Sequence, residues 1–170
     1  MDELRWQDEL YDFLKEQGVS LFTYVPDAGH RILIDRSLAD PDVTSIALTT
    51  EEEGVGVAAG AHLGGARAAL LMQSSGVGNC VNFFSLGKGG NFPIFSIISM
   101  RGDFGEGNPW QMPMGEAVEP VMTAMGIRSL RVDRPEDVIP TTSAALTQTF
   151  QSNQSTAVLL TQKLLGAKAF

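Results

Sequence analysis

The chain has 170 residues, 44% of them hydrophobic, and a formal net charge of −8 from 20 acidic and 12 basic side chains. This length fits one domain with a sizeable core, and the acidic balance excludes broad nucleic-acid binding, which needs clustered Lys and Arg. The single cysteine, Cys80, excludes an internal disulfide framework and a zinc site built on cysteines.

Hydrophobic periodicity and turn residues divide the chain into helices and strands that alternate. A helical stripe over residues 3–17 stops at Gly18, and the short β-rich run SLFTYV follows it. In chain order, the predicted elements are a helix over 3–17, a strand over 20–25, a helix over 28–38, a strand over 43–48, a helix over 51–63, a strand over 68–72, a helix over 77–86, a strand over 93–100, a helix over 115–125, a strand over 128–132, a helix over 135–149 and a strand over 156–160.

This alternation predicts right-handed βαβ units and the α/β class. We expect one three-layer domain over residues 1–170, with a mainly parallel sheet of about six strands and helices on both faces. The one long irregular segment, residues 102–113, is the candidate for a mobile or functional loop. Ligands of open α/β sheets bind at the carboxyl ends of the strands, which directs attention to residues 26–29, 50–51, 73–79 and the segment after residue 100.

The segment TTEEEGVGVAAG, residues 49–60, places three glutamates before a run of small residues. Its glycines have the spacing GxGxxxG and lie inside the predicted helix, and the carboxylates would repel a phosphate, so a dinucleotide site is disfavoured. Acidic side chains in a first turn also suit the helix dipole. Successive helix positions are about 100 degrees apart, so Glu51, Glu52 and Glu53 cannot share one environment. One carboxylate can therefore enter a site while the others stay in solvent.

The segment MQSSGVGN, residues 72–79, leaves a strand and enters a helix through two glycines. One interpretation is a tight turn with Ser75 or Asn79 as a helix cap. The alternative is a site at the strand end, for which Gln73 is the candidate. The two histidines, His30 and His62, are too few for a histidine-rich metal site, and we interpret each as a surface or packed residue.

No stretch of the sequence approaches the roughly 20 unbroken apolar residues that a membrane span needs. The first ten residues, MDELRWQDEL, are too acidic and too often interrupted by polar residues for a signal peptide. We therefore expect a cytoplasmic protein that binds neither membranes nor nucleic acid.

Four segments that follow predicted strand ends form an ordered set: PDAG at 26–29, EEEGVGVAAG at 51–60, MQSSGVGNCVNFFSL at 72–86, and RG at 101–102 followed by QMPMG at 111–115. Together they resemble the pyrimidine-binding domain of thiamine diphosphate-dependent decarboxylases. The resemblance is greatest to the alpha subunit of sulfopyruvate decarboxylase and to the N-terminal half of phosphonopyruvate decarboxylase. It runs over essentially the whole chain.

The resemblance implies three catalytic residues. In the family, a glutamate nine residues before the glycine that closes the small-residue triplet hydrogen-bonds N1′ of the cofactor's aminopyrimidine. Counting back from Gly60 identifies Glu51 as that glutamate. Asp27 matches an acidic residue after a Val-Pro pair, and Gln73 matches a polar position that faces the reacting centre.

Further contacts follow from the same resemblance. The implied cofactor-binding residues, besides Glu51, are Pro26, Gly76, Gly78 and Asn79. The candidates for substrate or interface contacts are Arg31, Arg101 and Gln111.

The resemblance also implies a partner. In the family, a second domain holds the diphosphate and Mg²⁺ with a Gly-Asp-Gly motif and a downstream Asn, and this chain contains no Gly-Asp-Gly. A separate beta subunit is therefore expected to complete a thiamine diphosphate site, in a heterotetramer or larger assembly. The implied reaction is decarboxylation of 3-sulfopyruvate to sulfoacetaldehyde and CO2. The alternatives are phosphonopyruvate or another 2-oxo acid as the substrate, and a non-catalytic interaction subunit of the same fold.

Overall fold

The structure is a computed structural model that describes residues 5–167. Its strands form one sheet of six strands in the order β2-β1-β3-β4-β6-β5, and every pair of neighbours is parallel. The strands are β1 (Val19–Tyr24), β2 (Thr44–Ala47), β3 (Arg67–Gln73), β4 (Phe95–Ser99), β5 (Arg128–Val132) and β6 (Thr156–Leu160). The predicted α/β class and six-stranded parallel sheet are confirmed.

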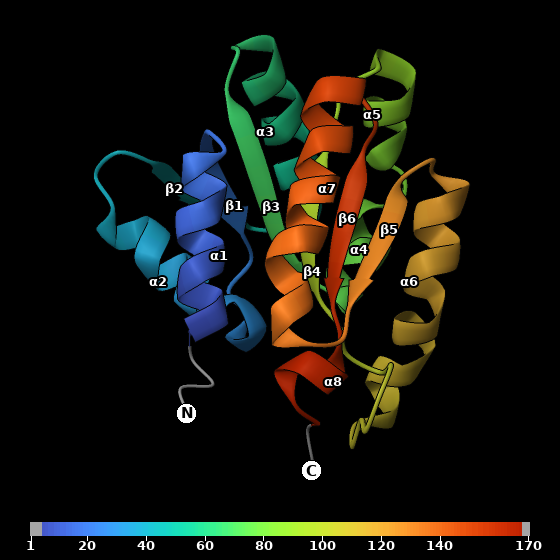
Figure 1. The fold of residues 1–170 in the computed structure, drawn as a ribbon. Helices are drawn as coiled ribbons and strands as arrows, with labels where there is room; N and C mark the ends of the chain where they lie inside the picture. The colour runs from blue at the N-terminus through green and yellow to red at the C-terminus, as the bar shows by residue number, and fades with distance from the viewer. Residues whose placement is uncertain (1–4, 168–170) are drawn as a thin grey trace.

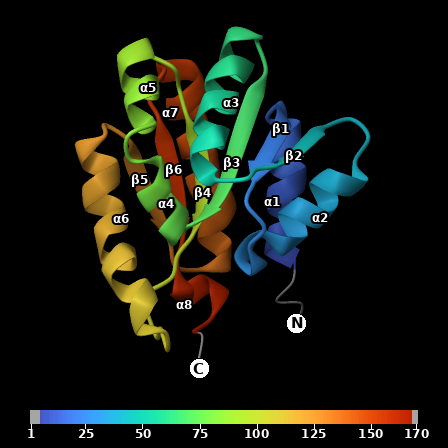
Figure 2. The same ribbon diagram turned by 180° about the vertical axis from the view of Figure 1, so that it is seen from behind.

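Helices cover both faces of the sheet and make three layers. The helices are α1 (Arg5–Glu16), α2 (Arg31–Ala39), α3 (Glu51–Leu63), α4 (Ser74–Cys80), α5 (Phe84–Gly90), α6 (Met112–Ala124), α7 (Val138–Ser152) and α8 (Gln162–Leu165). The face that carries α1, α2 and α7 is toward the viewer in Figure 1, and the reverse view in Figure 2 shows α3 to α6 over the other face.

The central strands β3, β4 and β6 carry the core on both of their faces. Alternation along the strands sends Leu71 and Ile97 into the cluster beneath α1 and α7, and Leu70 and Ile98 into the cluster beneath α3 to α6. All four side chains are fully buried. A strand buried on both faces has a nearly continuous apolar sequence, which is why residues 93–100 could be predicted as a strand.

Several boundaries differ from the prediction. The expected helix over 77–86 is two helices, α4 and α5, because the chain turns at residues 81–83 and brings Phe84 into the core while Val81 and Phe83 stay exposed. The segment predicted as a helix from residue 28 begins with a 3-10 turn, Ala28–His30, and α6 begins at Met112, before its predicted start. Four-residue α8 was not predicted, since it is too short to show a period. The predicted first helix begins at residue 3, and its first two residues, 3 and 4, lie outside the described residues.

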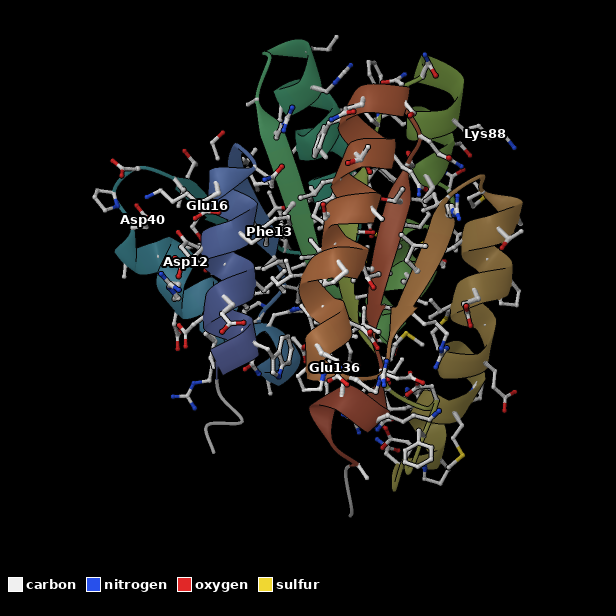
Figure 3. The ribbon with its side chains drawn as sticks, in the orientation of Figure 1. Asp12, Phe13, Glu16, Asp40, Lys88 and Glu136 are labelled. Atoms are coloured by element: carbon white, nitrogen blue, oxygen red, sulfur yellow. The ribbon has the colours of Figure 1, made fainter. Side chains whose placement is uncertain are left out.

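Exposed ion pairs join α1 to α2 and the turn that follows α2. Arg36 of α2 donates to Asp12 of α1 at 2.6 Å, and Lys15 donates to Asp40 at 2.6 Å. Figure 3 shows Asp12 and Asp40 on this side of the molecule, away from the strand ends that follow β3 and β4. Because such pairs are open to water, each contributes little stability, about 0–1 kcal/mol.

Candidate functional site

The three glutamates at the head of α3 lie in three different environments. Glu51 is 8% exposed, Glu52 is half-buried and Glu53 is exposed. Glu53 Oε2 accepts a 2.8 Å hydrogen bond from the Thr49 backbone N–H, and Glu52 Oε2 accepts a 2.7 Å bond from the Thr50 hydroxyl. The carboxylates of Glu52 and Glu53 therefore bind groups at the N-terminus of the helix, while Glu51 faces α4. The three glutamates do not share one environment, as the helical geometry predicts.

The Glu51 carboxylate lies against the backbone of α4. Asn79 Nδ2 donates a 2.8 Å hydrogen bond to Glu51 Oε2. A Cβ atom at Gly76 would lie 2.6 Å from Glu51 Cγ and 2.7 Å from its Oε1, so only glycine permits this approach. Among residues 5–167, Oε1 accepts no hydrogen bond. Gly78 lies one position before Asn79 but faces Met114 of α6 instead of the carboxylate.

The close packing at Gly76 gives a stability prediction. Gly→Ala inside a helix ordinarily stabilises by up to about 1 kcal/mol, and we expect that gain for Gly56→Ala in α3, where an added Cβ meets nothing within 4 Å. Gly76→Ala forces Glu51 away from Asn79, so it should cost about 1–3 kcal/mol instead. Urea unfolding of both variants measures the difference. Equal stabilisation by the two substitutions would contradict the packing.

A second group of polar residues lies at the ends of β1, β3 and β4. Asp27 Oδ2 accepts hydrogen bonds from the Gly29 backbone N–H at 3.0 Å and from the Ser99 hydroxyl at 2.6 Å. Gln73 Nε2 lies 3.4 Å from Asp27 Oδ1, and the Ser75 hydroxyl donates to Gln73 Oε1 at 2.9 Å. The structure therefore brings together Asp27 and Gln73, as the resemblance implies. It adds Ser99, which sequence reasoning missed because a serine inside an apolar strand gives no signal.

The Asp27 group borders a cavity of about 700 Å³ at the carboxyl edge of the sheet. Asp27, Ser99 and Arg101 line one side of the cavity, and Trp6 of α1 and Leu164 of α8 line another. Neither Glu51 nor Gln73 lines it. The predicted residues thus form two neighbouring groups, and α4, which begins directly after Gln73 and carries Gly76 and Asn79, connects them.

Beneath this group, His30 is a packed residue. It is 1% exposed, and its Nε2 lies 3.1 Å from the Met72 carbonyl oxygen at the end of β3. Its Nδ1 is buried without a hydrogen-bond partner. Burial lowers the pKa of His30, so the ring is neutral and donates from Nε2 to that carbonyl. His30 therefore ties the Ala28–His30 turn to β3.

Arg101 is engaged in an ion pair within the chain. Its Nε and Nη2 donate to the two carboxylate oxygens of Glu106 at 2.6 and 2.7 Å, and the Glu106 side chain is only 2% exposed. Glu106 also accepts from the backbone N–H groups of Gly102 and Asn108 and from Gln162 Nε2. Within the segment 102–113, which was expected to be mobile or functional, residues 102–111 are anchored by this pair.

The other two candidates for substrate contacts lie outside both groups. Arg31 is exposed and pairs with Asp35 one helical turn later at 3.5 Å. Gln111 is half-buried in the 3-10 turn Pro109–Gln111 that precedes α6. Pro26 is exposed at the turn before Asp27. The roles assigned to Arg31, Arg101 and Gln111 stay predictions.

The Glu106 pair predicts a pH dependence of stability. Hydrogen bonding from Arg101 lowers the pKa of Glu106 from 4.5 to about 2. A depressed pKa in the folded state means that the pair stabilises the fold fully above about pH 4.5 and that this contribution disappears as the pH falls toward 2. We expect the free energy of unfolding to fall more steeply over this range in the wild type than in Glu106→Gln. Urea titrations at successive pH values measure both slopes, and identical slopes would contradict the assignment.

The described part of the chain contains no cluster of three or more His, Cys, Asp or Glu side chains that could hold a metal ion. None of the helices within residues 5–167 is both long and apolar enough to cross a membrane.

Comparison with known proteins gives relatives that match most of the chain. The sulfopyruvate decarboxylase subunit alpha of Methanococcus maripaludis is 35% identical over 154 residues, which cover 90% of this chain and 92% of the relative. That of Methanothermobacter thermautotrophicus is 34% identical over 90% of this chain and 93% of its own length. The phosphonopyruvate decarboxylase of Streptomyces viridochromogenes is 38% identical over 90 residues, 52% of this chain and 23% of the relative. No family model matches the chain.

Among solved structures, a 2-oxoglutarate:ferredoxin oxidoreductase from Magnetococcus marinus has a similar fold, with a TM-score of 0.77. The match covers 94% of this chain and 29% of that chain at 14% identity. Similarity at this level of identity shows the fold alone.

Proposed function

The chain belongs to the family of sulfopyruvate decarboxylase alpha subunits, and from this premise we propose that it is the pyrimidine-binding subunit of a thiamine diphosphate-dependent decarboxylase of 3-sulfopyruvate. The whole chain, residues 1–170, forms the single domain that has this role. The observation that carries the proposal is the Glu51 carboxylate, 8% exposed and bound by Asn79, at the head of α3.

The residues around Glu51 fit the pyrimidine end of thiamine diphosphate. Asn79 fixes Oε2, and Oε1 is left to accept a hydrogen bond from a ligand. The missing side chain at Gly76 lets the carboxylate lie directly against α4. Thiamine diphosphate, when bound, supplies the electron sink that lets a 2-oxo acid release CO2. With the cofactor bound, Glu51 would hold a proton at a nitrogen of the pyrimidine ring, and its low exposure would limit competition from water.

The Asp27 group suits the reacting end of the substrate. Decarboxylation breaks the bond between the carbonyl carbon and the carboxylate carbon, and a proton must replace the departing CO2 to form the aldehyde. Asp27 and Gln73 lie side by side at the strand ends, beside a cavity that Asp27 lines. Asp27 would take up a proton from solvent and deliver it to the carbonyl carbon, and Gln73 would orient the carbonyl oxygen through its amide.

A beta subunit is proposed to complete the site. The relatives are named alpha subunits, and exposed apolar side chains on the α3 to α5 side of the sheet suit a partner. Leu63 of α3, Leu86 of α5, and Val81 and Phe83 of the turn between α4 and α5 are all exposed. The partner supplies the Gly-Asp-Gly motif and downstream Asn for the diphosphate and Mg²⁺, in a heterotetramer or larger complex in the cytoplasm. A phosphonopyruvate decarboxylase is the second candidate, because the match to that enzyme covers 52% of the chain.

Purification of the chain with its partner from its native cell tests the function. We expect a stoichiometric subunit with the Gly-Asp-Gly motif, bound thiamine diphosphate, and faster release of CO2 from 3-sulfopyruvate than from phosphonopyruvate. A preference for phosphonopyruvate would favour the second candidate. A partner complex that turns over equally well without this chain would make the chain a non-catalytic interaction subunit and contradict the proposal.

A further inference from the structure

We propose that Ser99, at the end of β4, is a positioning residue that holds the Asp27 carboxylate in its working orientation. The inference rests on the proposed function, in which Asp27 faces the reacting end of the substrate. Ser99 does not itself act on the substrate in this account. Its hydroxyl determines which oxygen of Asp27 is available to the site.

The contacts of Asp27 differ between its two oxygens. Oδ2 is held from two sides, by the Ser99 hydroxyl at 2.6 Å and by the Gly29 backbone N–H at 3.0 Å. Among residues 5–167, Oδ1 has only the Gln73 amide at 3.4 Å, a distance at which a hydrogen bond is weak. Hydrogen bonds to a carboxylate are stronger than those between neutral groups, so the short Ser99 contact dominates the orientation. Oδ2 is therefore fixed, and Oδ1 is left toward Gln73 and the site.

The sheet places Ser99 where it can do this. In the register of β3 and β4, Gln73 is the direct partner of Ser99, so the two side chains leave the same face of the sheet next to one another. Asp27, three residues beyond β1 on the other side of β3, reaches across to both. Ser99 is 3% exposed and also borders the 700 Å³ cavity. The low exposure of Ser99 limits competition from solvent for its hydroxyl, and a ligand in the cavity would lie beside the Ser99–Asp27 contact.

The turn after β1 packs closely against Ser99 and Asp27 at Gly29. A Cβ atom at Gly29 would lie 2.6 Å from Ser99 Cβ and 2.8 Å from Asp27 Oδ2. Glycine at this position thus lets Ser99, Gly29 and the carboxylate touch. Without the Ser99 hydroxyl, Oδ2 keeps only the Gly29 N–H, and the carboxylate is free to rotate about its last bond.

The test uses the assembled complex with Ser99→Ala, and Ser96→Ala as a matched control. Ser96 is also buried in β4, but its hydroxyl donates to the Thr156 carbonyl, on the opposite face of the strand and away from the site. We expect Ser99→Ala to lower kcat for 3-sulfopyruvate about 10- to 100-fold with little change in KM, because misplacing a reacting group acts on the chemical step. Ser96→Ala should keep kcat within about twofold of the wild type.

A double-mutant cycle with Asp27→Ala separates positioning from a general loss of structure. If Ser99 acts through Asp27, adding Ser99→Ala to Asp27→Ala should lower kcat no further. The same 10- to 100-fold loss in the absence of the Asp27 carboxylate would overturn the inference. Normal kcat in the Ser99→Ala complex would also overturn the inference. Failure of that variant to assemble would overturn it as well, because it would show that the hydroxyl has a structural role.

The experiments distinguish an error in the proposed function from an error in the role of Ser99. A wild-type complex that does not decarboxylate 3-sulfopyruvate overturns the proposed function and, with it, the role of Ser99. An active complex that is indifferent to Asp27→Ala overturns the roles of Asp27 and Ser99 only. An active complex that depends on Asp27 but not on Ser99 overturns this inference alone.

Discussion

Glu51→Gln is expected to lower decarboxylation by the assembled complex about 100- to 10,000-fold, the range that a positioned acid or base contributes. The substitution keeps the volume of the side chain and an oxygen that can accept from Asn79, which donates to Glu51 at 2.8 Å. It removes the charge with which, under the proposed function, Glu51 would hold a proton at the cofactor ring. Steady-state kinetics of the wild-type and variant complexes, prepared with equal amounts of bound thiamine diphosphate, measure the ratio of kcat values.

Glu53→Gln is the matched control for this prediction. Glu53 is two residues away on the same helix, is exposed, and accepts its hydrogen bond from the Thr49 backbone N–H. Its neutralisation weakens a favourable charge at a helix N-terminus, which costs about 0.3–1 kcal/mol of stability and should leave kcat near the wild-type value. Near-normal turnover in Glu51→Gln would remove Glu51 from the site, and a large loss in Glu53→Gln instead would move the assignment to Glu53.

Glu106→Ala is expected to destabilise the protein by about 3–5 kcal/mol, the cost of leaving one partner of a buried ion pair alone. The Glu106 side chain is 2% exposed and that of Arg101 is 17% exposed, so water compensates little for the lost partner. The variant also removes the acceptor for the Gly102 and Asn108 backbone N–H groups. The segment 102–111 should loosen as a result. Urea unfolding measures the loss, and proteolysis of the variant should begin within this segment.

Glu119→Ala serves as the comparison for Glu106→Ala. Glu119 also pairs with an arginine, Arg131, at 3.0 Å, but its side chain is 46% exposed. Exposed pairs contribute about 0–1 kcal/mol, so the control should unfold at nearly the wild-type urea concentration. Similar small losses in both variants would show that the Arg101–Glu106 pair does not anchor the segment.

The anchored segment, residues 102–111, exposes two aromatic side chains at the carboxyl edge of the sheet. Its aromatic residues Phe104 and Trp110 are 53% and 86% exposed, although the backbone of the segment is tied to Glu106 at Gly102 and Asn108. Arg101, a predicted substrate contact, uses two of its N–H donors in the ion pair with Glu106. Any contact of Arg101 with a substrate must therefore use one of its three other N–H donors, on Nη1 or Nη2, or follow a rearrangement of Glu106.

Local patterns were sufficient for the architecture. Apolar runs of strand length that alternate with helical stripes predicted all six strands and the parallel sheet, because a strand buried on both faces and an amphipathic helix leave different periods in the sequence. The separation of Glu51 from Glu52 and Glu53 also followed from helix geometry alone. The break between α4 and α5 could not be predicted from helix geometry, because it depends on the packing of Phe84 in the core.

The sequence by itself determined the fold class, whereas the site at the strand ends and the role of Glu51 at the head of α3 stay predictions. Only the tertiary structure decided which side chains meet there. Ser99 reaches Asp27 from 72 residues away along the chain, and Gln73 reaches it from 46 residues away. Such contacts follow from strand order and register, which bring distant strand ends to one edge of the sheet. The local sequence does not show which strand ends are neighbours in the sheet. It does show the periodicity that predicts each strand and helix.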